Sequence, residues 1–383
     1  MKKKINYGQI ALLIIAPILL ISKLFQFYLL PEKYFYDSNL ILGYMNKMPD
    51  YVDGSYRFVS NLFKKINYMN FTTIQEWSIL ITCCFFWIVL IIINHRKKYI
   101  DFMNVIYISC ATFLLGVYIF NIGKDIVQFV IFLFAAMIIS TRYIKYDIIK
   151  LIIVAVIFFI ESNIFRSYYI LVSVFAIYFY FILTYVQNKN KKISLKEVIF
   201  IIVVTLLMIY IFMKFAEKFK PDEYKNLMTV RDRTNGNREG SEDAVTMISE
   251  LLPTNGNLNM WMINYIINAV RILIPVELIA KGAKYLPFVI YQIISDYYLV
   301  KAILDINANK NPLKTISVCV FCAYLITSFA FEPDFGSFVR HETACFPVFV
   351  NIVIEEKYVR VPNDSKYIIK RSFNNVFKRN RHK

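Results

Sequence analysis

The sequence has little of what a nucleotide-driven enzyme or a disulfide-stapled domain requires. Only ten of its 383 residues are glycine and three are histidine, and no P-loop or G-x-G-x-x-G pattern is present. All six cysteines fall in apolar segments, which predicts buried packing residues and neither a disulfide framework nor a zinc site. These absences argue against ATP or a nucleotide-sugar as energy source. We expect no cofactor, while Mg²⁺ or Ca²⁺ held by carboxylates stays open.

Apolar residues dominate instead, at 58% of the chain, with 17% aromatic residues. Ten segments are long enough, or nearly so, to cross ~30 Å of hydrocarbon as helices. We therefore expect an all-α polytopic membrane protein of about ten spans, forming one integral domain over residues 1–383. The first segment has a basic start and no small-residue cleavage site, so it reads as an uncleaved span. The expected spans are 10–30, 76–94, 102–120, 126–140, 148–164, 168–186, 197–213, 286–304, 314–331 and 342–354.

Charge predicts the orientation of these spans. With Met1 in the cytoplasm, the cytoplasmic segments hold 25 Lys/Arg and 7 Asp/Glu, whereas the rest holds 19 and 20. This follows the positive-inside rule and places both termini in the cytoplasm, with a basic tail over 355–383. The sequence pI of about 9.4 then reflects topology, and contact with anionic lipid, rather than nucleic-acid binding. Residues 31–75 and 214–285 become the two long outer loops.

The second outer loop begins with a polar, charged strap and becomes apolar over residues 261–280. Arg271, Pro275 and Glu277 interrupt that apolar stretch. An eleventh span here would also put the basic tail outside. We expect instead an amphipathic helix at the outer interface, which follows the strap like a lid over a membrane-facing cleft.

Two short turns between spans carry polar residues on the outer side. The first is NIGKD at 121–125, where Lys124 is a substrate-binding candidate or a snorkelling anchor, and Asp125 a binding residue or a helix cap. The second is ESNIFRSYY, where Arg166 lies beside Glu161 and Tyr168 in a turn too short to be a solvated loop. We take Arg166 as a catalytic candidate and Tyr168 as a binding candidate.

Two further clusters lie later in the chain. Arg231 and Arg271 are candidate anion ligands of the long loop, although arginines there can equally be solvated one by one. The segment EPDFGSFVRHE at 332–342 is denser and contains the one histidine expected on the outer side, His341. Its candidates are Arg340 for binding, and Asp334, His341 and Glu342 for acid–base catalysis; the alternative is a salt-bridged turn that joins two spans.

NIGKD at a span junction, FRSYYIL at the next outer turn, a long late outer loop and EPDFGSFVRHE before the last span resemble the Wzy-type polysaccharide polymerases. The resemblance covers the whole chain in topology and these motifs in residues. Arg231 and its neighbours depart from the family's repeated Arg-rich loops. The resemblance implies a bacterial cytoplasmic-membrane enzyme that joins undecaprenyl-diphosphate-linked oligosaccharides at the outer face into capsular or exopolysaccharide.

By the same resemblance, Arg166, Arg231, Arg271 and Arg340 handle the diphosphates, and a flippase and a chain-length regulator are the protein partners to expect. Fixed arginines would stabilise the leaving diphosphate without a metal, and His341, Glu342 or Asp334 would take the acceptor proton.

Two other functions stay open. One is a lipid-linked-sugar glycosyltransferase of the membrane C-type fold, which needs an acidic residue in the first outer loop, where Asp37, Asp50 and Asp53 are available. The other is a flippase or transporter of lipid-linked oligosaccharide, which would place charges deep in its spans. Only Lys23, Glu161 and Asp296 approach such positions.

Overall fold

The structure, a computed structural model, describes residues 6–47, 49, 52, 54–189, 193–236, 246–254, 256–306 and 311–355. The described chain is helical throughout, and its one β-feature is an isolated bridge between Met247 and Asp334. The basic tail beyond residue 355 lies outside the described residues. The helices that make up the main bundle are α1 (Tyr7–Tyr28), α4 (Ile74–Arg96), α5 (Phe102–Leu114), α6 (Lys124–Ser140), α7 (Asp147–Ile164), α8 (Tyr169–Lys189), α9 (Leu195–Phe219), α13 (Leu286–Leu304) and α15 (Pro312–Phe331).

Six stretches of helix are long and apolar enough to cross a bilayer, which is consistent with a helical membrane protein. They are Tyr7–Tyr28, Ile74–Tyr99, Phe102–Ile119, Tyr169–Gln187, Leu195–Phe219 and Pro312–Phe331. The expected spans over 126–140, 148–164 and 286–304 correspond to α6, α7 and α13, and they remain predictions as spans.

The expected last span over 342–354 is not one helix. It is divided into α16 (Phe335–Ala344) and α17 (Phe346–Val353), which meet at Cys345. Pro347 lies in the first turn of α17, where its missing N–H costs nothing and its fixed φ favours a new helix start. His341 and Glu342 therefore belong to a short helix of their own.

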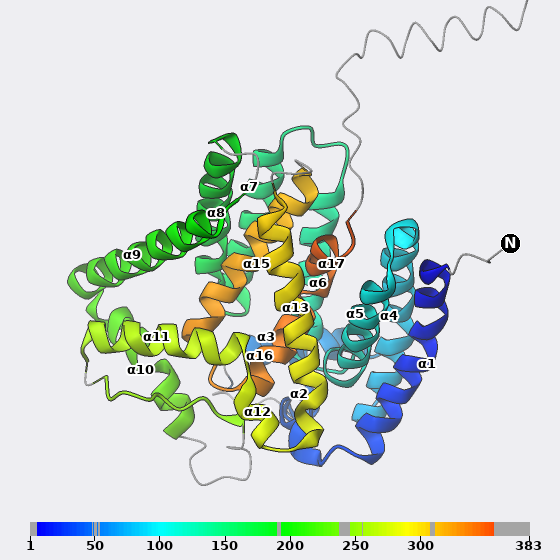
Figure 1. Cartoon of the computed structure of the whole chain (residues 1–383). Coiled ribbons are helices and arrows are strands. Elements are labelled where there is room, and N and C mark those ends of the chain that lie inside the picture. Colours follow the sequence, from blue (N-terminus) through cyan, green and yellow to red (C-terminus); the bar gives the residue numbers. More distant parts are fainter. Residues whose placement is uncertain are drawn as a thin grey trace, which may run out of the picture.

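The bundle is arranged around α15, most of whose residues are buried and which packs against α8, α17 and α6 (Figure 1). On one flank α1 packs against α4 and α5, while α9 lies at the opposite edge with its apolar side chains largely exposed. Such an exposed apolar face is what a helix in contact with lipid presents.

Shorter helices gather at one end of the bundle (Figure 1). The segment between α1 and α4 forms α2 (Tyr36–Asn46) and α3 (Gly54–Ile66), and the late segment forms α10 (Pro221–Gly236), α11 (Leu258–Leu273) and α12 (Val276–Ala280). The expected helix over 261–280 is therefore two helices, broken at Pro275. In Figure 1, α11 runs across the direction of α13 and α15, as an interfacial helix would.

A buried lysine shapes the junction between α5 and α6. The end of α5 widens into a π-helix over Leu115–Ile119, which frees backbone carbonyl groups. Lys23 Nζ donates to two of them, Gly116 O at 2.5 Å and Phe120 O at 2.9 Å, and to Ser78 Oγ at 2.7 Å. Gly116 permits this close packing, since an added Cβ would lie 1.9 Å from Ser22 Oγ. These hydrogen bonds of Lys23 stabilise the backbone just before the first turn of α6, which carries Lys124 and Asp125.

Candidate active site

The site lies where four elements converge at the end of the bundle that carries the short helices. The first turn of α6 supplies Asp125, the α7–α8 turn supplies Arg166, α16 supplies Arg340 and His341, and the residue after α15 is Glu332. The fold therefore brings together five sequence candidates from three distant segments of the chain, Lys124 and Asp125, Arg166, and Arg340 and His341.

Asp125 is the centre of this cluster. Its Oδ1 lies 3.1 Å from Arg166 Nη2 and 3.4 Å from His341 Nε2, and its Oδ2 lies 2.9 Å from Arg340 Nε. The Arg340 contact is an ion pair without hydrogen-bond alignment. Burial acts to raise the pKa of Asp125, but Arg340 and Arg166 together hold it well below its usual range. Asp125 is therefore a permanent counter-charge, not a proton carrier.

The Arg166 side chain is largely buried, at 11% exposure, and its Nη1 and Nη2 both have partners within the protein. Nη1 donates to Gln128 Oε1 at 2.5 Å, and Nη2 faces both Asp125 Oδ1 and His341 Nε2, the latter at 2.8 Å. Gln128 lies one helical turn after Asp125 in α6, so both side chains face the same direction. Two residues of α6 thus fix the plane of the guanidinium.

The partners of His341 define its tautomer. Nδ1 lies 2.8 Å from Glu332 Oε1, and Nε2 faces Arg166, which can only donate hydrogen bonds. Nδ1 therefore carries the hydrogen and donates to the Glu332 carboxylate, while the lone pair of Nε2 points at Arg166. A carboxylate behind a histidine whose second nitrogen can accept a proton is the arrangement of a general base.

A second layer of charge surrounds Arg340. Its Nη2 lies 3.7 Å from Asp37 Oδ2 in α2, and Asp37 also accepts a short hydrogen bond from the Tyr56 hydroxyl of α3. The ammonium of Lys124 lies 3.8 Å above the centre of the Tyr56 ring. Burial acts to raise the pKa of Asp37, but Lys124 and Arg340 hold it below its usual range. Through these contacts α2 and α3, which form the segment between α1 and α4, are joined to the site.

These residues open on a cleft of about 400 Å³, including the part open to solvent. Lys124, Arg340, Asp37 and Tyr34 line it together with Asp125, whereas Arg166 and His341 do not line it and contact Asp125 from within the protein. The more exposed cations therefore face the cleft, and the histidine lies in the next layer.

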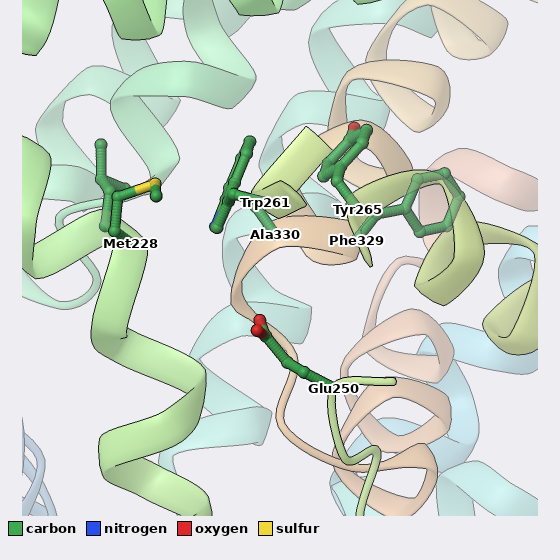
Figure 2. A pocket seen from close by; sticks show the side chains of 7 residues that line it. Met228, Glu250, Trp261, Tyr265, Phe329 and Ala330 are labelled. Atoms are coloured by element: carbon green, nitrogen blue, oxygen red, sulfur yellow. The ribbon is translucent and has the colours of Figure 1, made fainter. Parts of the chain in front are cut away.

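A smaller pocket of about 230 Å³, including the part open to solvent, lies between α10, α11 and the end of α15 (Figure 2). Trp261 and Tyr265 of α11 stack at 5.6 Å between ring centres, and the Glu250 side chain is directed toward the same space. Ala330 lines this cavity two residues before Glu332. Helices α10 and α11 thus lie against the end of α15, which leads to Glu332, the partner of His341.

Other sequence candidates do not join the cluster. Arg271 pairs with Glu277 at 2.5 Å and donates to Ser249 O at 2.6 Å, so it fastens the α11–α12 bend. Asp334 is the N-cap of α16 and accepts from Ser337 N at 2.7 Å. Glu342 is buried on another face of α16, and the side chain of Arg231 lies outside the described residues, although its backbone belongs to α10.

Tyr168 follows Arg166 by two residues and borders the cluster. Its ring stacks on the ring of Phe331, with the ring centres 4.9 Å apart. Phe331 is the last residue of α15, so this stack joins the α7–α8 turn to the segment that leads to Glu332.

Three participants were not among the sequence candidates: Glu332, Gln128 and Tyr56. Glu332 belongs to the dense acidic and basic segment, but nothing in its spacing to His341 distinguishes it from Asp334. Gln128 was detectable in principle, because it follows Asp125 by three residues in a helix. Within the described residues, no group of three or more His, Cys, Asp or Glu side chains is placed to hold a metal ion.

No protein-family model, no curated protein and no solved structure matches this chain.

Proposed function

We propose that this protein is a membrane glycosyltransferase that polymerises undecaprenyl-diphosphate-linked oligosaccharide repeat units at the outer face of a bacterial cytoplasmic membrane. The observation that carries the proposal is a connected series of side-chain contacts, Glu332–His341–Arg166–Asp125, next to a cleft lined by Lys124 and Arg340. It combines a positioned base with cations beside an open space at one end of an apolar bundle. Both termini are cytoplasmic in this proposal, so this end of the bundle faces outward.

The reaction makes a glycosidic bond and releases a lipid diphosphate. The acceptor hydroxyl oxygen attacks the anomeric carbon of the donor sugar as the bond from that carbon to the diphosphate oxygen breaks. Once the acceptor has displaced Arg166 from His341 Nε2, the hydroxyl proton passes to that atom, and the electron pair of the broken bond leaves with the diphosphate. Lys124 and Arg340 stabilise the charge that develops there.

Arg166 has a specific consequence for this step. The acceptor hydroxyl competes with Arg166 for the lone pair of Nε2. After proton transfer the imidazolium and the guanidinium repel each other, and Asp125 Oδ1, 3.4 Å from Nε2 and 3.1 Å from Arg166 Nη2, compensates that repulsion. Protonation of His341 therefore favours movement of Arg166 toward the negative leaving group.

A second function is favoured by Asp37. A C-type glycosyltransferase requires an acidic residue in the first outer loop, and Asp37 of that loop contacts Arg340 in the cleft. Such an enzyme would transfer a sugar from a lipid monophosphate carrier, and it would use Asp37 where the polymerase uses His341.

Purified protein, given separate donor lipids, distinguishes these functions. A polymerase converts undecaprenyl-diphosphate oligosaccharide into a ladder of products and releases undecaprenyl diphosphate, with a chelator present. A C-type enzyme acts on the lipid monophosphate sugar instead. Absence of any product from either donor, together with movement of intact lipid-linked oligosaccharide across vesicles, would overturn both and favour the flippase.

A further inference from the structure

The cleft of the candidate active site is lined by as many carboxylates as cations. Among the described residues, its charged side chains are Lys124 and Arg340, and Asp37 and Asp125. Two positive and two negative side chains cancel, so the lining as it stands offers an entering anion little net attraction. An anionic ligand therefore gains a cationic site only if one of the two carboxylates gives up its place.

Asp125 is held more firmly than Asp37. The Asp125 side chain is 10% exposed, and its oxygens lie 3.1 Å from Arg166 Nη2 and 2.9 Å from Arg340 Nε. The Asp37 side chain is 24% exposed, and its Oδ2 lies 3.7 Å from Arg340 Nη2, beyond the reach of a hydrogen bond. Asp37 is therefore the more accessible of the two carboxylates and the less tightly paired with a cation.

The backbone beside Asp37 is held independently of this carboxylate. Ser38 Oγ donates to Ile122 O at 2.7 Å, which fastens the first turn of α2 to the turn before α6. Asp37 can then leave the cleft by a change of side-chain rotamer while α2 remains in place. Its departure costs the contacts of one side chain and not the position of a helix.

The groups around the Asp37 carboxylate are of the kinds that bind a phosphate. The Tyr56 hydroxyl donates a short hydrogen bond to Oδ1, and Arg340 Nη2 faces Oδ2. The Lys124 ammonium lies 3.8 Å above the centre of the Tyr56 ring, so the ring keeps this cation beside the same place. A hydroxyl, a guanidinium and an ammonium are all donors that phosphate oxygens accept from. The Asp37 carboxylate thus occupies the place of a ligand oxyanion.

We propose that one phosphate group of the lipid-linked diphosphate binds where the Asp37 carboxylate lies in this structure, with Tyr56 Oη, Arg340 and Lys124 as its donors. Asp37 is then an internal competitor, which swings out when the ligand enters and returns when the product leaves. Tyr56 is a binding residue, because its hydroxyl passes from the carboxylate to the phosphate. This inference rests on the proposed function, since it adds a binding residue and a competitor to the same site.

The test measures binding of farnesyl diphosphate to the purified full-length protein by isothermal titration, with a chelator present. A competitor that is seated in most molecules weakens the apparent affinity by the fraction of molecules whose site is open, so Asp37→Ala should lower the Kd about tenfold or more. Asp37→Asn keeps the side-chain shape without the charge, and it should lower the Kd in the same direction even if the Ala variant fails to fold. Asp222→Ala, at an exposed carboxylate near the start of α10, is the matched control and should leave the Kd unchanged.

Tyr56→Phe separates the two partners of the tyrosine hydroxyl. In the parent background it removes a donor from the competitor and from the ligand alike, so the Kd should change by no more than about threefold. In the Asp37→Ala background only the ligand loses a donor, and the Kd should rise about tenfold. Equal effects of Tyr56→Phe in the two backgrounds would show that the hydroxyl does not pass from Asp37 to the ligand, and would overturn the proposal.

Inorganic diphosphate should show the same dependence on Asp37 at lower affinity, because it has the phosphates without the lipid. Equal affinities for the two diphosphates, with the Asp37 effect kept, would support this inference and count against a lipid carrier. A Kd for farnesyl diphosphate that Asp37→Ala leaves unchanged or raises would overturn this inference alone. Failure of the parent and of both Asp37 variants to bind either diphosphate would overturn the proposed function as well.

Discussion

His341 donates from Nδ1 to Glu332 Oε1 over 2.8 Å, which leaves its Nε2 as the proton-accepting atom. If this atom is the general base, His341→Ala should reduce polymerisation about 10²-fold or more, the usual scale for loss of such a group. His341→Gln should not restore activity, since an amide can form the hydrogen bonds but cannot take the proton. Polymer formation by purified protein, with the amount of folded protein measured in parallel, checks both variants. Gln-variant activity within a few-fold of the parent would show that His341 is only a structural residue.

Arg166→Lys should lose most of the activity although the charge is kept. The guanidinium contacts Gln128 and His341 through two different nitrogens, whereas an ammonium is a single point charge that cannot reproduce this fork. Arg142→Lys, an exposed site in the α6–α7 turn, is the matched control and should retain full activity. Polymer of normal length from the Arg166→Lys variant, at a normal level of protein in the membrane, would remove Arg166 from the site.

Asp125→Asn should destabilise the protein by about 3 kcal/mol or more, because it leaves Arg166 and Arg340 without their shared buried counter-charge. The folded pKa of Asp125 lies below its unfolded value near 3.9, so its contribution is complete above that value and is lost only as pH falls below it. In a His341→Gln background, which removes the titratable imidazole beside Asp125, the difference in stability made by Asp125→Asn should therefore stay constant from pH 5 to 8. Chemical unfolding at several pH values measures it, and a difference that shrinks across this range would contradict the assignment.

Lys23→Met should destabilise the bundle by several kcal/mol, roughly 1–3 for each acceptor that it leaves unsatisfied. Gly116 O and Phe120 O lose their donor, and the turn before Lys124 loses its support. Lys64→Met, on the exposed side of α3, is the control and should change stability little. Thermal unfolding of the three proteins under one condition gives the comparison; equal values for all three would refute the role of Lys23.

The orientation of the chain is tested by labelling two exposed tyrosine positions. Tyr68 is 89% exposed in the turn before α4, and Tyr143 is 97% exposed in the turn after α6. In a background without the six native cysteines, Tyr68→Cys should react with an impermeant thiol reagent in intact cells, whereas Tyr143→Cys should react only after lysis. Because both side chains are fully accessible, local shielding cannot explain a difference. Reaction at position 143 in intact cells would invert the topology.

The length of the apolar segments located single elements well. The expected span over 314–331 is α15 (Pro312–Phe331), because a long apolar run after a proline has one simple interpretation as a helix. The same reasoning missed the break at Cys345, since Phe346–Val353 is as apolar as a continuous span would be. Local composition cannot distinguish two short buried helices from one longer helix.

The candidate site was predicted as separate turns, and its assembly was not predictable. Asp125 and Arg340 belong to distant segments, and only the packing of α16 against α6 brings them together. Charge type alone also could not separate Arg340 from Arg271. The partner of Arg271 is Glu277, beyond a proline that ends the helix, so helical spacing gave no sign of that pair.

The bridge between Met247 and Asp334 has a consequence for the order of events. Ile248 N donates to Pro333 O at 2.9 Å, so the end of the late strap is bonded to the two residues that separate Glu332 from the start of α16. Departure of this strap breaks those bonds at the point where the backbone turns from the histidine's carboxylate toward the histidine itself. If His341 is the base, as we propose, this backbone contact links the position of residues 246–248 to the alignment of His341 with Glu332.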